Sequence, residues 1–326
     1  MYLFKKKANY HLLRKINNEE SKECLPMWLK ITLAIFVFVI ISVIIYTILN
    51  LQNEKNNANN TSTTDDDYII NDNTNNNCNN KLPFGSPILL SDKSTNIDIC
   101  HEAFTSRYDT IGKIPIWIAY IISNETILGC EKRSNKFSPD PTIPLYQSAI
   151  DSDYKNSGYD RGHMAPSADL AYDLNANIES FYYTNILPQL SYFNQGIWQT
   201  LEDYVRLWSF NLTNQNHKIQ IIIGTTYNNT SKKIGSGVIV SDYFFKILID
   251  INNTNNFFAF SFPNNASNGN LTIYQTTIDK IEKQYNIIFP INIKKNILND
   301  LSIANNTLYC KQKFIKCGRG CFKNGT

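Results

Sequence analysis

The pattern of hydrophobic and polar positions divides this chain into three regions. Residues 31–49 form a nineteen-residue run without a charged side chain, long enough for a helix that crosses a bilayer. Residues 51–80 are rich in Asn, Thr and Asp, so this segment buries too little apolar surface to fold. From residue 81 to residue 326, short apolar segments alternate with turn residues over a length that suits one sizeable domain.

Short runs of β-branched and aromatic residues predict strands after residue 81. The predicted strands lie at residues 114–122, 126–131, 218–224, 243–251 and 257–262. We expect the first two to pair with each other across an intervening turn. The loop that follows them contains Pro139, Pro141 and Pro144, which oppose helix formation.

Helical periodicity appears in three segments. Residues 177–183 predict a short helix, and residues 276–285 predict an amphipathic one. The longest helix is expected over residues 194–208, where Ile197, Leu201, Tyr204, Val205 and Trp208 fall within one arc. Strands that neighbour one another in sequence, with few helices, predict an α+β domain around a central, mostly antiparallel sheet flanked by helices.

The charges before the long apolar run predict an orientation. The first thirty residues hold seven Lys or Arg and three Glu, and such a basic excess favours the cytoplasm. A cleaved signal peptide is the competing interpretation, but small residues do not follow the run. We therefore expect a cytoplasmic tail at residues 1–30, a transmembrane signal anchor at residues 31–50, a disordered linker at residues 51–80 and a folded domain at residues 81–326. This arrangement predicts a single-pass type II membrane protein whose domain is lumenal or extracellular.

The composition beyond the anchor indicates the compartment of the domain and the way in which it would bind a nucleic acid. Of the net charge of +3, the first fifty residues contribute +4, so the remainder is near neutral and a nucleic acid must be held by a local basic site. Six cysteines lie beyond the anchor, an even number that predicts disulfides in an oxidising compartment. A zinc site at Cys310, Cys317 and Cys321 is the alternative, although its spacing is atypical. Glycosylation sequons such as Asn124-Glu-Thr and Asn211-Leu-Thr agree with export.

The most informative chemistry lies in residues 159–166, Tyr-Asp-Arg-Gly-His-Met-Ala-Pro. In an extended segment, residues i and i+2 point to the same face, so Arg161 and His163 are expected to share one surface. A guanidinium group can bind a phosphate, and an imidazole can accept a proton at neutral pH. These two side chains therefore suit the hydrolysis of a phosphodiester.

A second group of polar side chains lies on the longest predicted helix, at Asn194, Glu202 and Arg206. Phosphodiester hydrolysis needs an activated water and neutralisation of the charge that grows on the phosphoryl oxygens. A hard cation such as Mg²⁺ supplies that neutralisation, prefers oxygen ligands and takes only one or two from protein. The carbonyl oxygen of Asn194 could be such a ligand, with Glu202 orienting a metal-bound water.

Each of these residues also has an ordinary structural interpretation. Asn194 could cap its helix, and Glu202 with Arg206 could be a surface pair four residues apart. Arg161 could pair with a nearby aspartate, and His163 could be a hydrogen-bonded imidazole of the core. Taken one at a time, the signals are weak, and their order and spacing carry the functional interpretation.

Three ordered motifs resemble the DNA/RNA non-specific endonuclease family, whose members have the ββα-metal fold. They are residues 159–166, residues 183–189 (Tyr-Thr-Asn-Ile-Leu-Pro-Gln) and residues 193–202 (Phe-Asn-Gln-Gly-Ile-Trp-Gln-Thr-Leu-Glu). The resemblance extends from about residue 97 to near the C-terminus. It departs from the family at Gly224-Thr-Thr-Tyr, where many members have Gly-Pro, and at Met164, where Leu or Gln is common.

The resemblance implies a role for each matching residue. His163 would be the general base, Asn194 the ligand of one Mg²⁺ or Mn²⁺, and Glu202 the carboxylate that orients metal-bound water. The remaining matches are phosphate-binding or basic positions at Arg133, Arg161 and Arg206, and an amide at the edge of the site at Asn185. The implied reaction is endonucleolytic cleavage of DNA and RNA that leaves 5′-phosphates. Contacts to phosphate rather than to bases account for the low sequence specificity.

Several alternatives stay open from the sequence. A related phosphodiesterase or pyrophosphatase acting on nucleotides would use the same groups, and an inactive membrane-anchored protein could use the fold only for binding. A mitochondrial location in the intermembrane space competes with the lumenal one, since a signal anchor and a mitochondrial targeting helix are not cleanly separable. Besides DNA and RNA, the predicted partners are a second copy of the chain in a homodimer and the membrane, which residues 31–50 would contact.

Overall fold

A computed structural model describes residue 78 and residues 81–267, 269–293, 295–299, 301, 311–313 and 316–317. The predicted tail, signal anchor and almost all of the predicted linker lie outside these residues. Within the described part of the chain, no helix has the length and apolar character that spanning a membrane requires.

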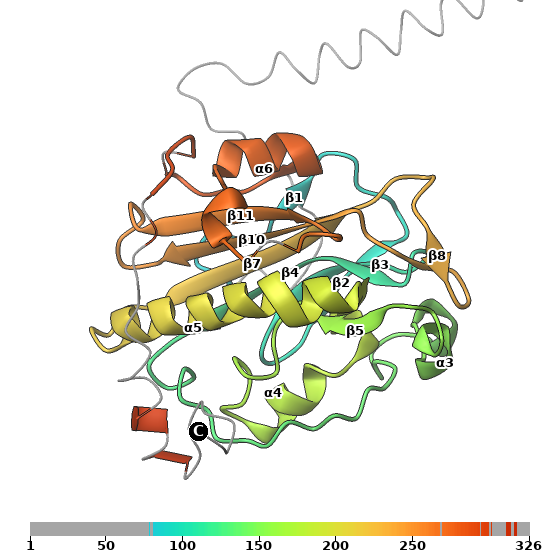
Figure 1. Ribbon diagram of the computed structural model, residues 1–326, viewed down its shortest axis with the longest axis horizontal. Coiled ribbons are helices and arrows are strands. Elements are labelled where there is room, and N and C mark those ends of the chain that lie inside the picture. The colour runs from blue at the N-terminus through green and yellow to red at the C-terminus, as the bar shows by residue number, and fades with distance from the viewer. Residues whose placement is uncertain are drawn as a thin grey trace, which may run out of the picture. The chain divides into compact units, whose positions relative to one another are not determined.

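A seven-stranded antiparallel sheet forms the centre of the described domain (Figure 1). Its order is β12-β11-β10-β7-β4-β3-β2, and each strand runs antiparallel to its neighbours. The strands are β2 (Asn96–Cys100), β3 (Thr105–Asp109), β4 (Ile114–Ile122), β7 (Ile219–Thr226), β10 (Tyr243–Asp250), β11 (Phe257–Pro263) and β12 (Gln275–Thr276). The predicted α+β class with a mostly antiparallel sheet is confirmed.

One predicted strand is wrong. Residues 126–128 lie in a turn and residues 129–131 are irregular, and the Ile127 amide donates to the Ser123 carbonyl at 3.0 Å. Both edges of β4 are occupied instead by β3 and β7. The prediction chose the segment next along the chain, whereas β4 pairs with a segment about a hundred residues away.

Three two-stranded ribbons stand beside the main sheet. They pair β1 (Ile88–Leu89) with β13 (Ile287–Ile288), β5 (Asp160–His163) with β6 (Ile186–Gln189), and β8 (Lys233–Ile234) with β9 (Val238–Ile239). The β5–β6 ribbon holds the Arg-Gly-His segment in an extended form, the condition under which Arg161 and His163 share one face.

The helices differ from their predicted bounds at their ends. They are α3 (Asp151–Tyr154), α4 (Leu174–Glu179), α5 (Gln199–Thr213) and α6 (Ile278–Tyr285), with short 3-10 turns at Leu145–Gln147, Tyr183–Asn185 and Leu271–Ile273. The Asp173 side chain caps α4 by accepting from the Asn175 and Ala176 amides, so this helix begins and ends earlier than predicted. The longest helix is preceded by a wide, π-type turn at Phe193–Trp198, because Gly196 adopts non-helical angles there.

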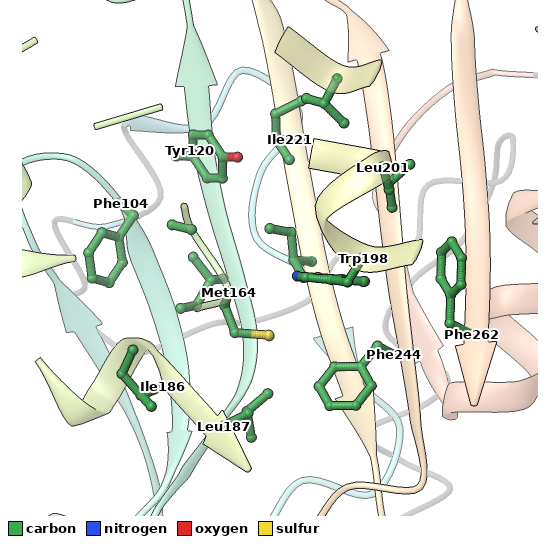
Figure 2. Packing of buried hydrophobic residues seen from close by; sticks show 14 of the residues in the cluster. Phe104, Tyr120, Met164, Ile186, Leu187, Trp198, Leu201, Ile221, Phe244 and Phe262 are labelled. Atoms are coloured by element: carbon green, nitrogen blue, oxygen red, sulfur yellow. The ribbon is translucent and has the colours of Figure 1, made fainter. Parts of the chain in front are cut away.

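The sheet separates two hydrophobic layers. The helices α5 and α6 lie on opposite faces of the sheet (Figure 1). Side chains of α5 such as Leu201 and Val205 belong to one layer, and Ile278 and Ile281 of α6 belong to the other. Figure 2 shows the α5 side, where Trp198 packs among Phe244 and Phe262. The core thus fixes α5, and with it the polar side chains that the preceding turn and the helix present.

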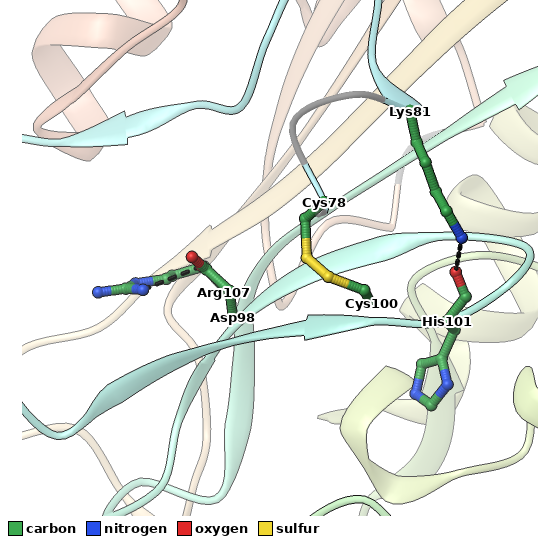
Figure 3. Close-up of a disulfide and its surroundings, with 6 residues drawn as sticks. All are labelled: Cys78, Lys81, Asp98, Cys100, His101 and Arg107. Carbon is green, nitrogen blue, oxygen red and sulfur yellow. Dashed lines mark hydrogen bonds and ion pairs between the residues drawn. A yellow bond between two sulfur atoms is a disulfide. The ribbon is translucent and has the colours of Figure 1, made fainter. Parts of the chain in front are cut away.

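Two disulfides occur within the described residues, Cys78–Cys100 and Cys130–Cys317. The first joins the start of the domain to the end of β2, beside a hydrogen bond of 2.9 Å from the Lys81 ammonium to the His101 carbonyl (Figure 3). The second connects the C-terminal segment to the loop before Arg133. The structure thus joins these four cysteines in two candidate disulfides, and the sulfur of Cys317, bonded to Cys130, is not available to the alternative zinc site.

Candidate active site

The ribbon of β5 and β6 sets the direction of two functional side chains. Arg161 pairs with Pro188 and His163 pairs with Ile186 across the ribbon, so both side chains point to the same side. Gly162 between them is required, because a Cβ at this position would lie 2.0 Å from the Gln189 side-chain oxygen. Local sequence and close packing together place the guanidinium and the imidazole on one surface.

The wide turn before α5 brings Asn194 to the same surface. The Asn194 amide nitrogen donates to the Asp160 carboxylate at 3.0 Å, and Ser191 and Gln195 donate to the same carboxylate at 2.6 and 2.7 Å. Burial opposes ionisation of Asp160, but these three hydrogen bonds lower its pKa below the ordinary value. With its nitrogen engaged, Asn194 keeps its carbonyl oxygen for another ligand.

A cavity of about 250 Å³ collects these side chains. All the predicted site residues except Asn185 line it, together with Ser167, Gln195 and Gln199; the predicted ones are Arg133, Arg161, His163, Asn194, Glu202 and Arg206. Residues from a loop, a ribbon and a helix thus meet although they span more than seventy positions of sequence. The cavity also brings His163 and Asn194 to one place, as the proposed chemistry demands.

His163 is the most buried titratable group in the cavity, with 7% of its surface exposed. Its ring lies 5.5 Å from the Phe137 ring and 4.9 Å edge-on from the Phe181 ring, and its Nε2 atom has no hydrogen-bond partner. Burial, aided by the charge of Arg133, lowers the pKa of His163 to about 3. The imidazole is therefore neutral at physiological pH and keeps one nitrogen to accept a proton. The Nε2 atom thus lacks the hydrogen bond that the ordinary interpretation would give it.

Two of the three arginines rest on aromatic rings. The Arg133 guanidinium lies 4.9 Å from the centre of Phe181, and the Arg161 guanidinium lies 5.2 Å from the centre of Phe137. Arg133 also donates to the Ser167 hydroxyl at 2.6 Å, and Arg161 donates to Asp151 at 2.5 Å. These contacts hold both cations at the cavity wall with donor groups to spare.

Two carboxylates hold the Arg206 side chain in place. Its guanidinium donates to Asp169 at 3.1 Å and also pairs with Asp203 at 2.5 Å. Asp169 in turn accepts from the Tyr120 hydroxyl at 2.7 Å, which links this arginine to the central sheet. The arginine is therefore positioned by a polar network that a surface pair within one helix would not predict.

Glu202 projects from the first turn of α5 into the cavity. Burial raises the pKa of its carboxyl to about 7, against the lowering effects of Lys246 and Arg206. Shifts of this kind occur where a carboxylate waits for a cation or a proton. Its environment therefore differs from that of an exposed helix pair.

Asn185 lies beneath the cavity rather than at its edge. Its side chain is fully buried, accepts from the Ala165 amide at 2.9 Å, and donates to the Ala165 and Ser180 carbonyls at 2.9 and 2.7 Å. These bonds hold the chain just after His163. The structure thus assigns Asn185 a supporting position, where the sequence predicted an amide beside the reaction.

The donor set of the cavity fits a hard divalent cation. Asn194 offers an amide oxygen and Glu202 a carboxylate. Among the described residues, no cluster of three or more His, Cys, Asp or Glu side chains is arranged to hold a metal ion, in this cavity or elsewhere. One or two oxygen ligands with several waters are what Mg²⁺ takes in proteins.

Sequence reasoning missed several supporting residues. Phe137 and Phe181 carry the arginines and enclose His163, but no spacing connects either ring to the motif. Lys246 lies in a predicted strand among apolar residues, and its charge in that run was the available signal. Gln199 was detectable, since it stands one helical turn after Gln195.

The chain is similar to known nucleases in sequence and to a solved structure in fold. Residues 84–296 match the DNA/RNA non-specific endonuclease family. The chain is 31% identical to Nuclease EXOG, mitochondrial, of Homo sapiens over 209 residues, which are 58% of this chain and 56% of that protein. It is 26% identical to Nuclease C1 of Cunninghamella echinulata var. echinulata over 242 residues, which are 68% of this chain and 92% of that protein.

The chain also resembles a second human protein and a solved structure. It is 28% identical to Endonuclease G, mitochondrial, of Homo sapiens over 178 residues, which are 51% of this chain and 57% of that protein. A chain in the crystal structure of the EndoG/EndoGI complex matches with a TM-score of 0.55 at 24% identity, covering 64% of this chain and 91% of that one, a likeness of fold. The matched region spans between 29% and 61% of the mitochondrial EXOG relatives.

Proposed function

This chain belongs to the DNA/RNA non-specific endonuclease family, a family of hydrolases, and from that premise we propose that it cleaves phosphodiester bonds within DNA and RNA. The reaction would require a divalent cation and leave 5′-phosphates. We assign β5, β6 and the turn that leads into α5 as its ββα-metal unit, because these elements carry His163 and Asn194. The observation that carries the proposal is that the His163 imidazole, the Asn194 carboxamide and three guanidinium groups share one small cavity.

His163 would take the proton from the attacking water. Its Nε2 atom has no partner, and its low pKa keeps it in the neutral form that a base requires. The surrounding rings exclude bulk water and hold the imidazole in one orientation. As the phosphate enters, its negative charge would stabilise the protonated ring and raise its basicity during the reaction.

Arg133, Arg161 and Arg206 would bind the phosphate. Each guanidinium already has an aromatic or carboxylate support, so binding immobilises little additional side chain. Because phosphates carry no sequence, contacts of this type give little discrimination between sites or between DNA and RNA. That expectation agrees with the near-neutral domain, which offers a local basic site rather than a general positive field.

Asn194 would bind a Mg²⁺ or Mn²⁺ ion through its carbonyl oxygen, and Glu202 would orient the waters around that ion. The bound cation would stabilise charge on the phosphoryl oxygens and the leaving group. Asp160 would serve this site by holding the Asn194 nitrogen, which leaves the oxygen directed to the cavity.

The test is cleavage by the full chain, purified in a mild non-ionic detergent, with Mg²⁺, with Mn²⁺ and with excess chelator. We expect nicking and linearisation of circular plasmid, degradation of RNA and no cleavage with chelator. His163→Ala should lose a factor of about 10² to 10⁴ in rate while keeping its thermal melting temperature. A His163→Ala protein that cleaves as fast as the wild type would contradict the assignment of His163 as the general base.

The same assay separates the alternative functions. A nucleotide phosphodiesterase would prefer free dinucleotides in competition with long DNA, and it would leave circular plasmid intact. An inactive binding protein would retain nucleic acid without cutting it under any divalent ion. Either result would replace the endonuclease assignment.

We further propose that the domain works in an oxidising compartment, which two disulfides support. The lumen of the secretory pathway, the cell exterior and the mitochondrial intermembrane space all qualify. A glycosidase-sensitive mobility shift of the protein from cells would support the secretory route. A mitochondrial fraction without such a shift would support the intermembrane space.

A further inference from the structure

A second cavity, of about 620 Å³, lies outside the candidate active site and is larger than the cavity that holds it. It is lined where β7 and β11 end and β10 begins, and by the residues just before β5 and just after β6. The proposed cleavage reaction uses none of its side chains. We call it the tyrosine cavity, after three rings that line it together with one lysine: Tyr159, Tyr227, Tyr243 and Lys232.

Lys232 is supported by an aromatic ring in the same way as two arginines of the active site. Its ammonium nitrogen lies 4.9 Å from the centre of the Tyr159 ring, and its backbone carbonyl accepts from the Val240 amide at 2.8 Å. The ring contacts of Arg133 and Arg161, at 4.9 and 5.2 Å, are of the same kind. The exposed Lys232 side chain therefore offers a positioned cation to an anionic ligand.

The β5–β6 ribbon connects the tyrosine cavity to the active site. Tyr159 stands two residues before Arg161, and two residues of extended chain span at most about 7 Å. The buried Asn264 side chain fixes the other strand, since it donates to the Pro188 carbonyl and accepts from the Leu190 amide, both at 3.2 Å. Pro188 is the residue that pairs with Arg161 across the ribbon. The two cavities are thus held at a fixed spacing along one rigid element.

The charges of the tyrosine cavity favour a phosphate at Lys232. Asp242 is the only acidic side chain in its lining, and its carboxylate already accepts from the Asn228 carboxamide at 3.2 Å and the Ser231 hydroxyl at 2.9 Å. Among the described residues, Lys232 forms no ion pair with a carboxylate. The Tyr243 side chain is 41% exposed. A cation beside exposed aromatic rings is the arrangement with which proteins hold single-stranded nucleic acids.

We propose that the tyrosine cavity is a subsite for the substrate strand, in which Lys232 binds a backbone phosphate that flanks the scissile one and the Tyr243 ring stacks on a base. This inference rests on the proposed function, because it extends the path of the strand that the active site would cut. Phosphates of B-DNA follow one another about every 3.4 Å along a strand, so a strand bound at Arg161 reaches Tyr159 within a few nucleotides.

The first test measures binding without cleavage. Fluorescence anisotropy in excess chelator gives the affinity of the full chain for a labelled thymidine oligomer of about 20 nucleotides at several salt concentrations. Lys232→Gln should reduce the slope of log K against log salt by about 0.7, the contribution of one single-strand phosphate contact, and should weaken binding about fivefold at about 0.1 M salt. The protein is first freed of N-glycans, because Asn265 at the rim of the cavity begins an Asn-Ala-Ser sequon.

Three further variants separate the charge from the ring and from the fold. Lys232→Arg keeps the cation and should keep the slope of the wild type. Tyr243→Leu should weaken binding about fivefold or more with an unchanged slope, because stacking releases no counterions. Lys218→Gln removes an exposed charge at the opposite end of β7 and is the matched control, with the affinity and slope of the wild type.

The second test compares two substrates that differ in length. A thymidine dinucleotide has one phosphodiester bond and no flanking phosphate, so Lys232→Gln should cleave it as efficiently as the wild type does. For the longer oligomer, kcat/KM should fall about fivefold, mainly through KM. An equal loss on both substrates would place the effect in the active site or in folding and would overturn the subsite.

The binding test also separates this inference from the proposed function. A wild type that cuts no nucleic acid would remove the proposed function, but its salt slope in chelator would still report the contact at Lys232. A Lys232→Gln protein with the wild-type slope would overturn the phosphate contact even if the wild type is an active nuclease. An unchanged affinity of Tyr243→Leu would overturn the stacking.

Discussion

The side-chain nitrogen of Asn194 donates to the carboxylate of Asp160 at 3.0 Å, which links the turn before α5 to strand β5. This bond decides which end of the carboxamide faces the cavity. With nitrogen committed to Asp160, oxygen faces the position where a cation would bind. An amide without such a partner could rotate and present its nitrogen, which is not a metal ligand.

Asp160→Ala should therefore weaken the response to Mg²⁺ before it weakens substrate binding. Loss of an outer partner of a metal ligand typically costs about 10- to 100-fold in affinity or activity. We expect the Mg²⁺ concentration for half-maximal cleavage to rise by about that factor. Glu125→Gln, an exposed carboxylate outside the cavity, is the matched control. An unchanged Mg²⁺ titration of Asp160→Ala would contradict the assigned geometry.

The pH dependence of cleavage should be governed by Glu202. Burial raises the pKa of this carboxyl to about 7, and its ionised form is the one that orients a hydrated cation. We expect kcat/KM to rise with pH through about 7 at fixed Mg²⁺. His163 adds no step between pH 5 and pH 9, because burial lowers its pKa to about 3. Glu202→Gln should flatten the profile, and a variant that retained the same rise would assign it to another group.

Asn185→Ala should damage both stability and activity. The substitution leaves the Ala165 amide and two carbonyls without partners inside the protein. Each unsatisfied buried group costs about 1 to 3 kcal/mol, so urea denaturation should show a free energy of unfolding lower by about 2 kcal/mol or more. Activity should fall at temperatures where the variant is still folded, because the chain after His163 loosens. Asn175→Ala, at an exposed position of α4, should leave both quantities unchanged.

A buried ion pair should make stability depend on pH at both extremes. Burial alone would lower the pKa of His101, but Asp140 and Glu179 raise it from 6.5 to about 9. Burial alone would raise the pKa of Asp140, but His101, Thr142 and Thr184 lower it to about 2. The stabilisation from His101 is complete below pH 6.5 and is lost as pH rises through about 9. That from Asp140 is present above pH 3.8 and is lost as pH falls through about 2. Melting temperatures across this range should fall less steeply at the alkaline end for His101→Gln than for the wild type.

The disulfide between Cys130 and Cys317 should stabilise the domain by closing a long loop. Cross-links of this type contribute about 2 to 4 kcal/mol. Cys317→Ser should lower the melting temperature in oxidising buffer, and a reductant should lower that of the wild type toward the same value. Cys24→Ser, before the predicted anchor, serves as the control. Equal melting temperatures for the wild type and Cys317→Ser in oxidising buffer would show that the bond adds nothing.

The part of the site that follows from local geometry was predictable. Arg161 and His163 stand two residues apart in an extended segment, and an extended backbone places such residues on one side. The strands around residues 218–224, 243–251 and 257–262 were predicted for a similar reason, because runs of β-branched and aromatic residues suit a buried sheet. The helix α6 could be predicted from the amphipathic periodicity of its own residues alone.

The contacts between distant segments were not predictable in this way. Strand β4 pairs with β7 across about a hundred residues, so its neighbour could not be read from adjacency. Asn185 was placed at the edge of the site, but its carboxamide fills a buried position between two turns. Lys246 faces Trp198 only because the sheet and α5 stack in this order.

The amino-acid sequence by itself determined the class of the domain, the identity of its reactive groups and the short-range geometry that pairs Arg161 with His163. Tertiary structure decided which of those groups meet, which are buried and which charge each one faces. The physical reason is that backbone periodicity acts over a few residues, whereas burial and pKa depend on everything that packs around a group. His163 is a strong example: its chain position predicts a titratable imidazole, and only its enclosure by Phe137 and Phe181 makes it neutral and unpartnered.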